Sequence, residues 1–507
     1  MTPPSPARPP ARRWRWVLAA GAGGVALVAY WLTLLPGLGN GGDTAKFQFL
    51  GRVLGIGHPT GYPLYLLLNW AFGHLPIGTL AYRINLLSAL LGATAVALLV
   101  PVLARLGAGR YAPIGALWIA FSYTFWSQAI VAEVYTLHAL YLVAALAAIL
   151  AWGEEGRASG LAWSLFFIGL AFSHHLLIVT ALAGFLAYAI ATNWKALLRR
   201  PALVGAAAGV VAGTLPYAYL FWRTAAEAPY LEGKVRTLGD LFAFVSGGPF
   251  RASMAVVGES APLGSRLVET LRYVFLEWTP VGWLLVPLGA AVLCRAKPRA
   301  ALLLGLIAAG DLGFAATYDV PDYFVFLLPF YLVCGAVAVQ VLPTLERLLT
   351  PRLGERAAIC LTLGLGALLA GALAVTNGRL LDRSEDVEAE RSARAILDAV
   401  GEPAVILSAN YDLANYLYYD LLTESAYQGR EVYVVQSIGW DALRAYLVGS
   451  GRLPQVEQGP PDGVPPGLPA FVASNAAEFE RAGFALQPVA GAGFPLFHLA
   501  GSAAGPR

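Results

Sequence analysis

The sequence has few charged residues and few cysteines, and both shortages limit what the protein can be. Only 13% of its 507 residues are charged and 58% are hydrophobic, with a mean hydropathy of +0.62. Ordinary soluble domains carry about 25% charged residues, so a soluble globule is excluded. The net charge is +3 and the basic residues are scattered, which argues against a nucleic-acid partner. Cys294, Cys334 and Cys360 lack the paired spacing of a zinc site or disulfide framework, and we expect them to be packing residues.

Two further patterns are missing. There is no repeated half, which a transporter with its site at the membrane midplane should show, although glycine (55) and proline (33) are plentiful. The C-terminal quarter has no GxGxxG or P-loop motif, so nucleotide binding is not indicated.

Apolar runs dominate what is present. A membrane span takes roughly 17 to 25 residues, and we count about eleven such runs. The predicted fold class is therefore an α-helical polytopic membrane protein. The runs lie at about 17–35, 82–104, 111–131, 137–152, 160–173, 175–193, 201–222, 273–294, 300–317, 322–345 and 357–377.

The positive charges predict the orientation of these runs. If the N-terminus with Arg12, Arg13 and Arg15 is cytoplasmic, every second short loop is basic, in agreement with the positive-inside rule. An odd number of spans then places the chain after about residue 378 outside. We therefore predict a cytoplasmic segment 1–16, a membrane domain 17–378 with a first external loop at 36–81, and an external domain 379–507. The first run could also mimic a signal peptide, but we interpret it as a retained anchor.

A polar cluster comes directly after the first apolar run. The segment Gly41 to Tyr65 brings Asp43, Lys46, Arg52 and His58 beside the membrane. Ionisable groups next to hydrocarbon are costly unless paired or used, so the cluster is a functional-site hypothesis. The predicted topology places further polar residues at or near the same membrane face: His74, Arg83, Glu133, His138, His174, His175, Asp319 and Asp322.

Each of these residues has a structural alternative. Asp43 is predicted to act as a catalytic base, but Gly-Gly-Asp-Thr is also a good helix-capping sequence. The basic side chains of Lys46, Arg52, His58 and Arg83 are candidates for binding a phosphate, or can extend to lipid headgroups. Pro59, Gly61 and Pro63 predict a sharp turn before an interfacial aromatic stretch, Tyr62 to Phe72.

The remaining candidates are predicted to bind substrate. Glu133 and His138 are five residues apart and do not share a helix face, and interhelical hydrogen bonding is their alternative role. His174 and His175 point apart on a helix, so a metal site there is disfavoured. Asp319 and Asp322 are expected to bind substrate or a divalent cation, or to cap the following helix.

The composition changes after residue 378. A charged helix-like stretch, 382–398, is succeeded by the apolar segments AVILS, EVYVVQ and PAFVAS with helical segments between them. Such alternation predicts a small α/β domain. We expect an accessory domain outside the membrane, with a role in binding the acceptor.

Five ordered segments resemble a known family. They are GDTAKFQFLGRVLGIGHPTGYPLY, YRINLLSALLGA (Tyr82 to Ala93), FWSQAIVAEVYTLHAL (Phe125 to Leu140), GLAFSHHLL (Gly169 to Leu177) and YDVPDYFVFLLPFYLV (Tyr318 to Val333). They resemble the DUF2723 family, which includes TMEM260-like protein O-mannosyltransferases and is similar to the wider GT-C glycosyltransferases. The resemblance covers about residues 15 to 345. The tail run VILSANYDLANYLYY (Val405 to Tyr419) also resembles the segment located after the membrane part of many bacterial members.

The resemblance implies a multi-pass membrane glycosyltransferase, expected in a bacterial inner membrane. It implies transfer of a sugar, with mannose a possibility, from a polyprenyl-phosphate donor to a protein or envelope-glycan acceptor on the external face. Such enzymes usually place an acidic residue in the first external loop, where Asp43 stands. A flippase for lipid-linked sugars and a noncatalytic envelope-assembly protein are the alternatives, and both should tolerate Asp43→Asn. No resident cofactor is predicted.

Overall fold

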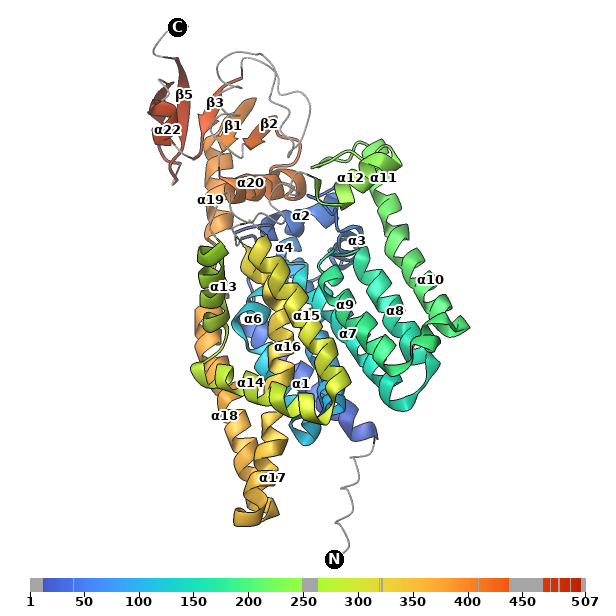
Figure 1. The fold of residues 1–507 in the computed structure, drawn as a ribbon. Coiled ribbons are helices and arrows are strands. Elements are labelled where there is room, and N and C mark those ends of the chain that lie inside the picture. The colour runs from blue at the N-terminus through green and yellow to red at the C-terminus, as the bar shows by residue number, and fades with distance from the viewer. Residues whose placement is uncertain are drawn as a thin grey trace, which may run out of the picture.

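The computed structural model describes residues 12–39, 41–248, 263–318, 320, 322–408, 410–436, 468–474, 476–481, 484–492 and 494–502. These residues form a long bundle of helices with a small sheet at one end (Figure 1). Helix α1 (Arg12–Leu32) begins at the other end, so the start of the bundle and the sheet lie far apart. Asp319 is one of the predicted site residues and lies outside the described residues.

The bundle is built from helices of unequal length. Three short helices, α2 (Thr44–Val53), α3 (Pro63–Phe72) and α12 (Leu238–Val245), lie at the end that carries the sheet (Figure 1). The others are α4 (Leu80–Leu103), α5 (Ala112–Ala120), α6 (Tyr123–Ala129), α7 (Tyr135–Glu155), α8 (Ala158–Phe172), α9 (Ile178–Asn193), α10 (Arg200–Thr214), α11 (Ala218–Ala225), α13 (Leu263–Glu277), α14 (Pro280–Ala296), α15 (Pro298–Thr317), α16 (Leu328–Ala338), α17 (Val341–Leu353) and α18 (Glu355–Leu381).

The number of spans differs from the predicted eleven. In the described part of the chain, eight stretches are long and apolar enough to cross a membrane, or nine if a bent helix pair counts as one span. Three departures from the predicted runs explain the difference. The runs at 82–104 and 111–131 share the single stretch Leu80–Ala120, the run at 160–173 forms the 15-residue helix α8, and the run at 273–294 belongs to the bent pair. The count of eleven is therefore not confirmed.

Small residues allow close helix packing where α8 meets α10. Gly205, Gly209 and Gly213 recur every four residues and form one stripe along α10. A Cβ atom on Gly209 would lie 2.7 Å from the carbonyl oxygen of Leu165, and one on Gly213 would lie 2.1 Å from that of Gly169. Because lipid is as apolar as the helix surfaces, the hydrophobic effect does not drive helices together in a membrane, and close backbone packing is a main source of their association. The stripe explains why a glycine-rich run nevertheless forms a stable helix.

Two buried carboxylates accept hydrogen bonds from backbone N–H groups at the starts of two other helices. Glu277 accepts hydrogen bonds from the backbone nitrogen of Thr124 (3.0 Å) and from its hydroxyl (2.7 Å), at the start of α6. Asp311 accepts one from the backbone nitrogen of Phe330 (2.9 Å), in the first turn of α16. Backbone groups at a helix start have no partner within the helix, and water is scarce among apolar spans. Both acids therefore have a structural role.

The C-terminal domain is the predicted α/β unit. Its five-stranded sheet has the order β2-β1-β3-β5-β4. Strands β1 (Ala404–Ser408), β2 (Val432–Gln436) and β3 (Ala470–Val472) are parallel, and β4 (Phe484–Pro488) and β5 (Phe497–Ser502) are added antiparallel. Helices α19 (Glu388–Ala399), α20 (Tyr411–Thr423) and α22 (Ala476–Arg481) complete it. Helix α20 lies between the sheet and α2 (Figure 1), so the domain rests directly on the end of the bundle.

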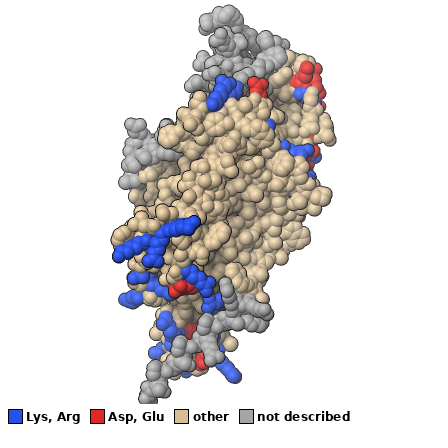
Figure 2. Space-filling view, turned by 90° about the vertical axis from the view of Figure 1, so that its right-hand side faces the viewer, with Lys and Arg blue, Asp and Glu red and all other residues tan. Residues whose placement is uncertain are grey.

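Charged side chains gather toward the ends of the bundle. Figure 2 shows one flank whose middle is almost free of charge, with most of its Lys and Arg side chains in the half away from the sheet. In that half, Arg105 and Lys297 pair with Glu154 at 2.8 and 2.7 Å. An uncharged belt between charged ends is the surface that a multi-pass integral membrane protein presents to lipid.

Candidate functional site

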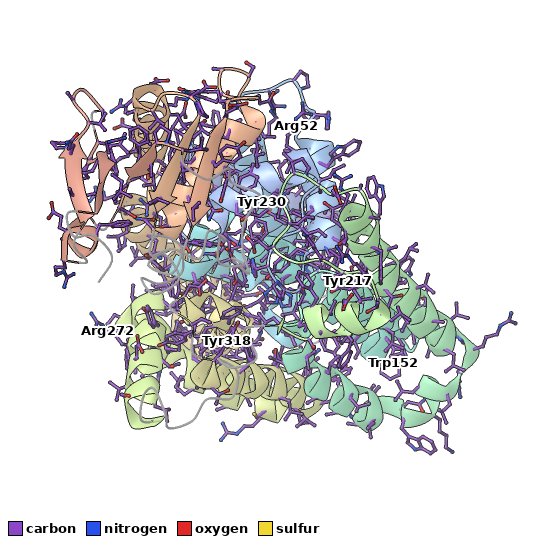
Figure 3. All side chains as sticks on the ribbon, turned by 90° about the horizontal axis from the view of Figure 1, so that it is seen from above. Arg52, Trp152, Tyr217, Tyr230, Arg272 and Tyr318 are labelled. Atoms are coloured by element: carbon purple, nitrogen blue, oxygen red, sulfur yellow. The ribbon has the colours of Figure 1, made fainter. Side chains whose placement is uncertain are left out.

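Four segments meet at the end of the bundle below the C-terminal domain. They are α2, the turn from Leu54 to Tyr62, the loop 226–237 and the start of α20. The loop runs beside the turn because the backbone nitrogen of Ile56 donates to Tyr230 (2.9 Å) and that of Glu232 donates to Ile56 (2.9 Å). Seen from above, Tyr230 lies in projection between Arg52 and Tyr318 (Figure 3). Residues far apart in sequence therefore surround one site.

Lys46 is the centre of this site. Its side chain is 1% exposed, and its ammonium group lies 2.9 Å from Asp43 Oδ1 and 3.0 Å from Glu232 Oε1. It also contacts His58 Nδ1 at 3.1 Å and the hydroxyl of Tyr411. Burial alone would lower the pKa of Lys46, but Asp43 and Glu232 hold it well above its ordinary value. The lysine is therefore a fixed cation that binds several groups together.

Asp43 does not act as the helix cap that its sequence allows. It occupies the N-cap position of α2, but its side chain makes no capping hydrogen bond. Instead, Oδ1 accepts from Lys46 and from the Tyr411 hydroxyl (2.6 Å), and Oδ2 lies 3.4 Å from His58 Nε2. Burial alone would raise the pKa of Asp43, but His58, Lys46 and Tyr411 keep it well below the ordinary value. The carboxylate is ionised, and its side chain is 29% exposed.

His58 connects the cluster to the aromatic side of the site. Because an ammonium group only donates, Nδ1 of His58 accepts from Lys46, and the proton lies on Nε2, which is 2.9 Å from the Tyr62 hydroxyl. Burial, opposed by the charge of Asp43, lowers the pKa of His58 and favours this neutral form. The predicted sharp turn is present: the backbone nitrogen of Gly61 donates to His58 (2.7 Å), and Gly61 has a positive φ of 85°.

Two more acids lie near Asp43. Glu133 is buried and accepts a hydrogen bond from the Thr44 hydroxyl (3.1 Å). Burial, together with the charges of Asp43 and Asp322, raises the pKa of Glu133 well above its ordinary value. Asp322 is exposed at the surface, but partial desolvation by its surroundings and the charge of Asp43 also raise its pKa. Asp322 is the N-cap of the 3-10 helix Tyr323–Leu327 but makes no side-chain capping bond. Both acids share the electrostatic environment of Asp43.

The other predicted histidines form an aromatic group next to His58. The ring of Tyr62 lies 5.8 Å from that of His175 and 6.4 Å from that of His174, and His138 lies 5.9 Å from His175. His174 donates through Nε2 to the carbonyl of Val134 (2.7 Å). In the described part of the chain, no group of three or more His, Cys, Asp or Glu residues is arranged to hold a metal ion. A role for a divalent cation remains a prediction.

Arg52 and Arg83 lie apart from the Lys46 cluster. Arg52 is exposed and donates to Nε2 of His74 (3.1 Å) near the end of α3. Arg83 donates to the backbone carbonyls of Gly78 (3.3 Å) and Thr79 (3.1 Å), and also to that of Gly73. The guanidinium of Arg83 thus closes the loop between α3 and α4. The structure therefore brings together Asp43, Lys46 and His58, but not these two arginines.

Asn85 and Gln48 hold the segment that leads to Asp43. The side-chain amide of Asn85 donates to the carbonyls of Leu35 (2.9 Å) and Gly37 (3.1 Å). Gln48 donates to Gly37 (3.1 Å) and to Asn85 (2.9 Å), and accepts from the backbone nitrogen of Gly39 (3.3 Å). Both side chains are completely buried. They fix the chain between α1 and α2, and so set where Asp43 stands.

The sequence interpretation missed several partners of Lys46 and Asp43. Glu232, Tyr230, Tyr411 and Asp412 were not predicted as site residues. Tyr230 donates to Glu232 Oε1 (2.8 Å), and Asp412 Oδ1 accepts from the backbone nitrogen of Gly42 (2.9 Å). A signal existed for two of them, because Tyr411 and Asp412 lie inside the tail run from Val405 to Tyr419. Glu232 has no comparable motif.

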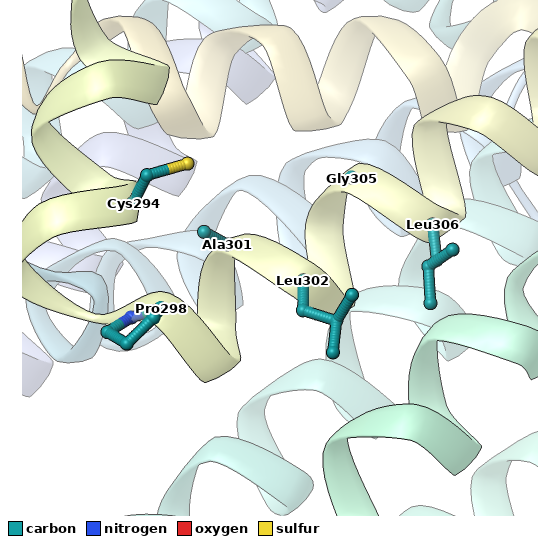
Figure 4. A pocket seen from close by; sticks show the side chains of 6 residues that line it. All are labelled: Cys294, Pro298, Ala301, Leu302, Gly305 and Leu306. Carbon is teal, nitrogen blue, oxygen red and sulfur yellow. The ribbon is translucent and has the colours of Figure 1, made fainter. Parts of the chain in front are cut away.

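A separate hollow lies on the outer surface of the bundle, between α14 and α15 (Figure 4). It measures about 290 Å³ and is lined by Cys294, Pro298, Ala301, Leu302, Gly305 and Leu306. Its lining offers no carboxylate or basic group, so we do not assign it a role in the reaction. Cys294 and Cys360 are free and exposed and Cys334 is free and buried, so only Cys334 packs in the interior as predicted.

Comparison with known families supports the predicted resemblance. Residues 43–198 match the family model of the protein O-mannosyl-transferase TMEM260 N-terminal domain. The chain is 37% identical over 151 residues to protein O-mannosyl-transferase TMEM260 of Mus musculus, a match that covers 28% of this chain and 21% of that protein. It is 34% identical over 71 residues to the tmem260 protein of Dictyostelium discoideum, covering 13% of this chain and 8% of that one. The chain thus matches only about a fifth of the mouse relative's length.

A solved structure shows the fold. The crystal structure of ArnT from Cupriavidus metallidurans bound to undecaprenyl phosphate matches with a TM-score of 0.63 and 16% identity, covering 98% of this chain and 100% of that chain. At this identity the likeness shows the fold alone. The chain therefore shares the fold of this ArnT structure and has a small C-terminal sheet, which agrees with the predicted GT-C-like architecture. The predicted resemblance is confirmed, although the matched part of the family, 43–198, is shorter than the predicted 15–345.

Proposed function

We propose that the protein is a membrane glycosyltransferase that moves a sugar from a polyprenyl-phosphate carrier to a hydroxyl group of a protein or envelope-glycan acceptor. The observation that best supports this proposal is the state of Asp43. This residue is an ionised, partly exposed carboxylate that its own helix does not use as a cap. The matched O-mannosyl-transferases support a sugar transfer, and the undecaprenyl phosphate bound to ArnT supports a lipid-phosphate carrier. Mannose is the sugar that these relatives suggest.

Asp43 is the proposed base. The acceptor hydroxyl oxygen attacks the anomeric carbon of the sugar, the bond from that carbon to the phosphate oxygen breaks, and the phosphate leaves with the electron pair. The hydroxyl proton passes to Asp43. The low pKa of Asp43 is compatible with this role, because the hydroxyl becomes acidic as the new bond forms, so a weakly basic carboxylate suffices if it is in reach.

The basic residues are proposed to stabilise the leaving phosphate. His58, whose Nε2 lies 2.9 Å from the Tyr62 hydroxyl and 3.4 Å from Asp43 Oδ2, is proposed to donate a hydrogen bond to the phosphate, and Lys46 supplies a fixed positive charge. We propose that Arg52 and Arg83, at the end of α2 and the start of α4, attract the lipid phosphate at the membrane surface. We propose Tyr62, Glu133, His138, His174 and Asp322 as substrate-binding residues around the reacting sugar.

The test is an assay of the purified protein in liposomes with a panel of polyprenyl-phosphate sugars and candidate acceptors. A glycosyltransferase forms a glycosylated acceptor and free polyprenyl phosphate. A flippase instead moves the intact donor across the bilayer without forming a product. Finding translocation without product would replace the proposed function by the flippase alternative.

We propose that the site faces outward, as the charge pattern of the loops predicts. Ser425 is exposed in the C-terminal domain, and Arg352 is exposed near the opposite end of the bundle. With Cys294 and Cys360 changed to alanine, Ser425→Cys is expected to react with a membrane-impermeant thiol reagent on intact cells. Arg352→Cys, the matched control, should react only after lysis. The reverse pattern would place the site on the cytoplasmic side.

A further inference from the structure

The C-terminal domain places a side chain directly on the proposed base. Tyr411, the first residue of α20, donates its hydroxyl proton to Asp43 Oδ1 (2.6 Å). The same hydroxyl oxygen contacts the ammonium group of Lys46. A phenol has one proton to donate and lone pairs to accept with, so one hydroxyl serves both charged groups. Because Lys46 and Tyr411 both bind Oδ1, Oδ2 keeps only the longer contact of 3.4 Å to His58 Nε2 among the contacts described above.

The next residue holds the backbone that carries Asp43. Asp412 Oδ1 accepts from the backbone nitrogen of Gly42 (2.9 Å), and a Cβ atom on Gly41 would lie 3.0 Å from Asp412 Oδ2. Asp412 therefore holds the two residues before Asp43 against α20. Gly42 has a positive φ of 71°, which glycine adopts readily.

Helix α20 is itself fixed to the membrane domain. The Tyr419 hydroxyl accepts from the backbone nitrogen of Ala81 (3.1 Å) at the start of α4. The ring of Tyr418 lies 5.4 Å from that of Tyr230 and 6.5 Å from that of Phe49. Asn410 caps the helix by accepting from the backbone nitrogen of Leu413 (3.0 Å). Tyr411 thus stands on a rigid support, which a positioning residue requires.

We propose that the C-terminal domain is part of the active site, with Tyr411 as the positioning residue that holds Asp43 for proton transfer. The inference rests on the proposed function, since it takes Asp43 as the base. Tyr411 fixes which carboxylate oxygen is free for the acceptor hydroxyl, and Asp412 fixes the backbone on which that carboxylate stands. This role goes beyond the accessory function expected for the domain.

The test is Tyr411→Phe, which removes the hydroxyl and keeps the ring. Turnover is expected to fall about 10- to 100-fold, the effect of losing a hydrogen bond to a charged group, while the KM for the donor stays within about twofold. The matched control is Tyr416→Phe on the same helix, whose hydroxyl has no hydrogen bond to the described site residues. It should keep the wild-type turnover. Wild-type turnover in Tyr411→Phe, or a loss seen only in the donor KM, would overturn the proposal.

A double-mutant cycle separates this inference from the proposed function. If Tyr411 acts through Asp43, adding Tyr411→Phe to Asp43→Asn should cause no further loss of turnover, and additive losses would overturn the inference. If the wild-type protein transfers no sugar, the proposed function fails, and the same four proteins are compared by thermal unfolding. Tyr411→Phe should lower the midpoint less in the Asp43→Asn background than in the wild type. Equal shifts would overturn the contact itself.

Discussion

Replacing Asp43 by asparagine is expected to lower turnover about 10²- to 10⁴-fold, the range for losing a general base. The amide keeps the size of the side chain and can still accept hydrogen bonds from Lys46 and Tyr411, but it does not take up the acceptor proton. Because a base acts in the transition state, kcat should fall while the KM for the donor changes little. Steady-state transfer from the polyprenyl-phosphate sugar to the acceptor measures both quantities.

The control for this variant is the loss of a carboxylate elsewhere at the same end of the molecule. Glu385 comes after α18 and is exposed, so Glu385→Gln changes the net charge equally without touching the site. It should keep the wild-type kcat. Arg52→Ala and His58→Ala should instead weaken use of the donor, through lost contacts to its phosphate. Wild-type turnover in Asp43→Asn would remove the base assignment and favour the flippase or a noncatalytic protein.

The local part of the site was predictable from the sequence, and the distant part was not. Asp43, Lys46 and His58 lie within sixteen positions of one another, directly after an apolar run. Glu232 and Tyr411 are 186 and 365 residues away from Lys46. No sequence pattern predicts that either residue contacts Lys46, because the loop 226–237 and α20 reach Lys46 only when the whole fold is packed. Only the resemblance of the tail run pointed toward Tyr411.

Capping shows where sequence interpretation was most misleading. Both Asp43 and Asp322 occupy N-cap positions, as their sequences allow, but neither side chain makes a capping bond. Glu277 and Asp311 were not predicted to have a role. They lie on other helices and accept hydrogen bonds from the first residues of α6 and α16. A local sequence shows which residue can cap its own helix. It does not show which distant carboxylate reaches a helix end inside the bundle, because that depends on three-dimensional packing.

The apolar runs predicted helices more reliably than they predicted crossings. Each of the eleven runs contains helix, since a long apolar segment in lipid has to satisfy its own backbone. The number of crossings depends instead on where a run bends. The bent pair Leu267–Phe275 and Pro280–Ala296 meets at 104°, and the broken stretch Leu80–Ala120 contains Gly107 with a positive φ of 119°. Composition alone does not distinguish such bends from straight helix.

Replacing Lys46 by methionine is expected to be the most destabilising change in the site. The side chains of Lys46 and Glu232 are each 1% exposed. Removing the ammonium group leaves the Glu232 carboxylate buried without its counter-ion. Among the contacts described above, only the Tyr230 hydroxyl would still donate a hydrogen bond to it. Removing one partner of a buried ion pair costs about 3–5 kcal/mol. The loss should appear as a lower midpoint of thermal unfolding in detergent and as a loss of activity, because Asp43 also loses its fixed neighbour.

A rescue and a control distinguish charge from packing in this prediction. Adding Glu232→Gln to Lys46→Met removes the uncompensated charge, so the double variant should recover much of the unfolding midpoint but not the activity. The control is Lys297→Met, whose ion pair with Glu154 is exposed at 37% and 38%. Exposed pairs contribute at most about 1 kcal/mol, so this variant should unfold near the wild-type midpoint. If Glu232→Gln fails to restore the midpoint, the stabilising effect of Lys46 lies in the packing of its side chain and not in the ion pair.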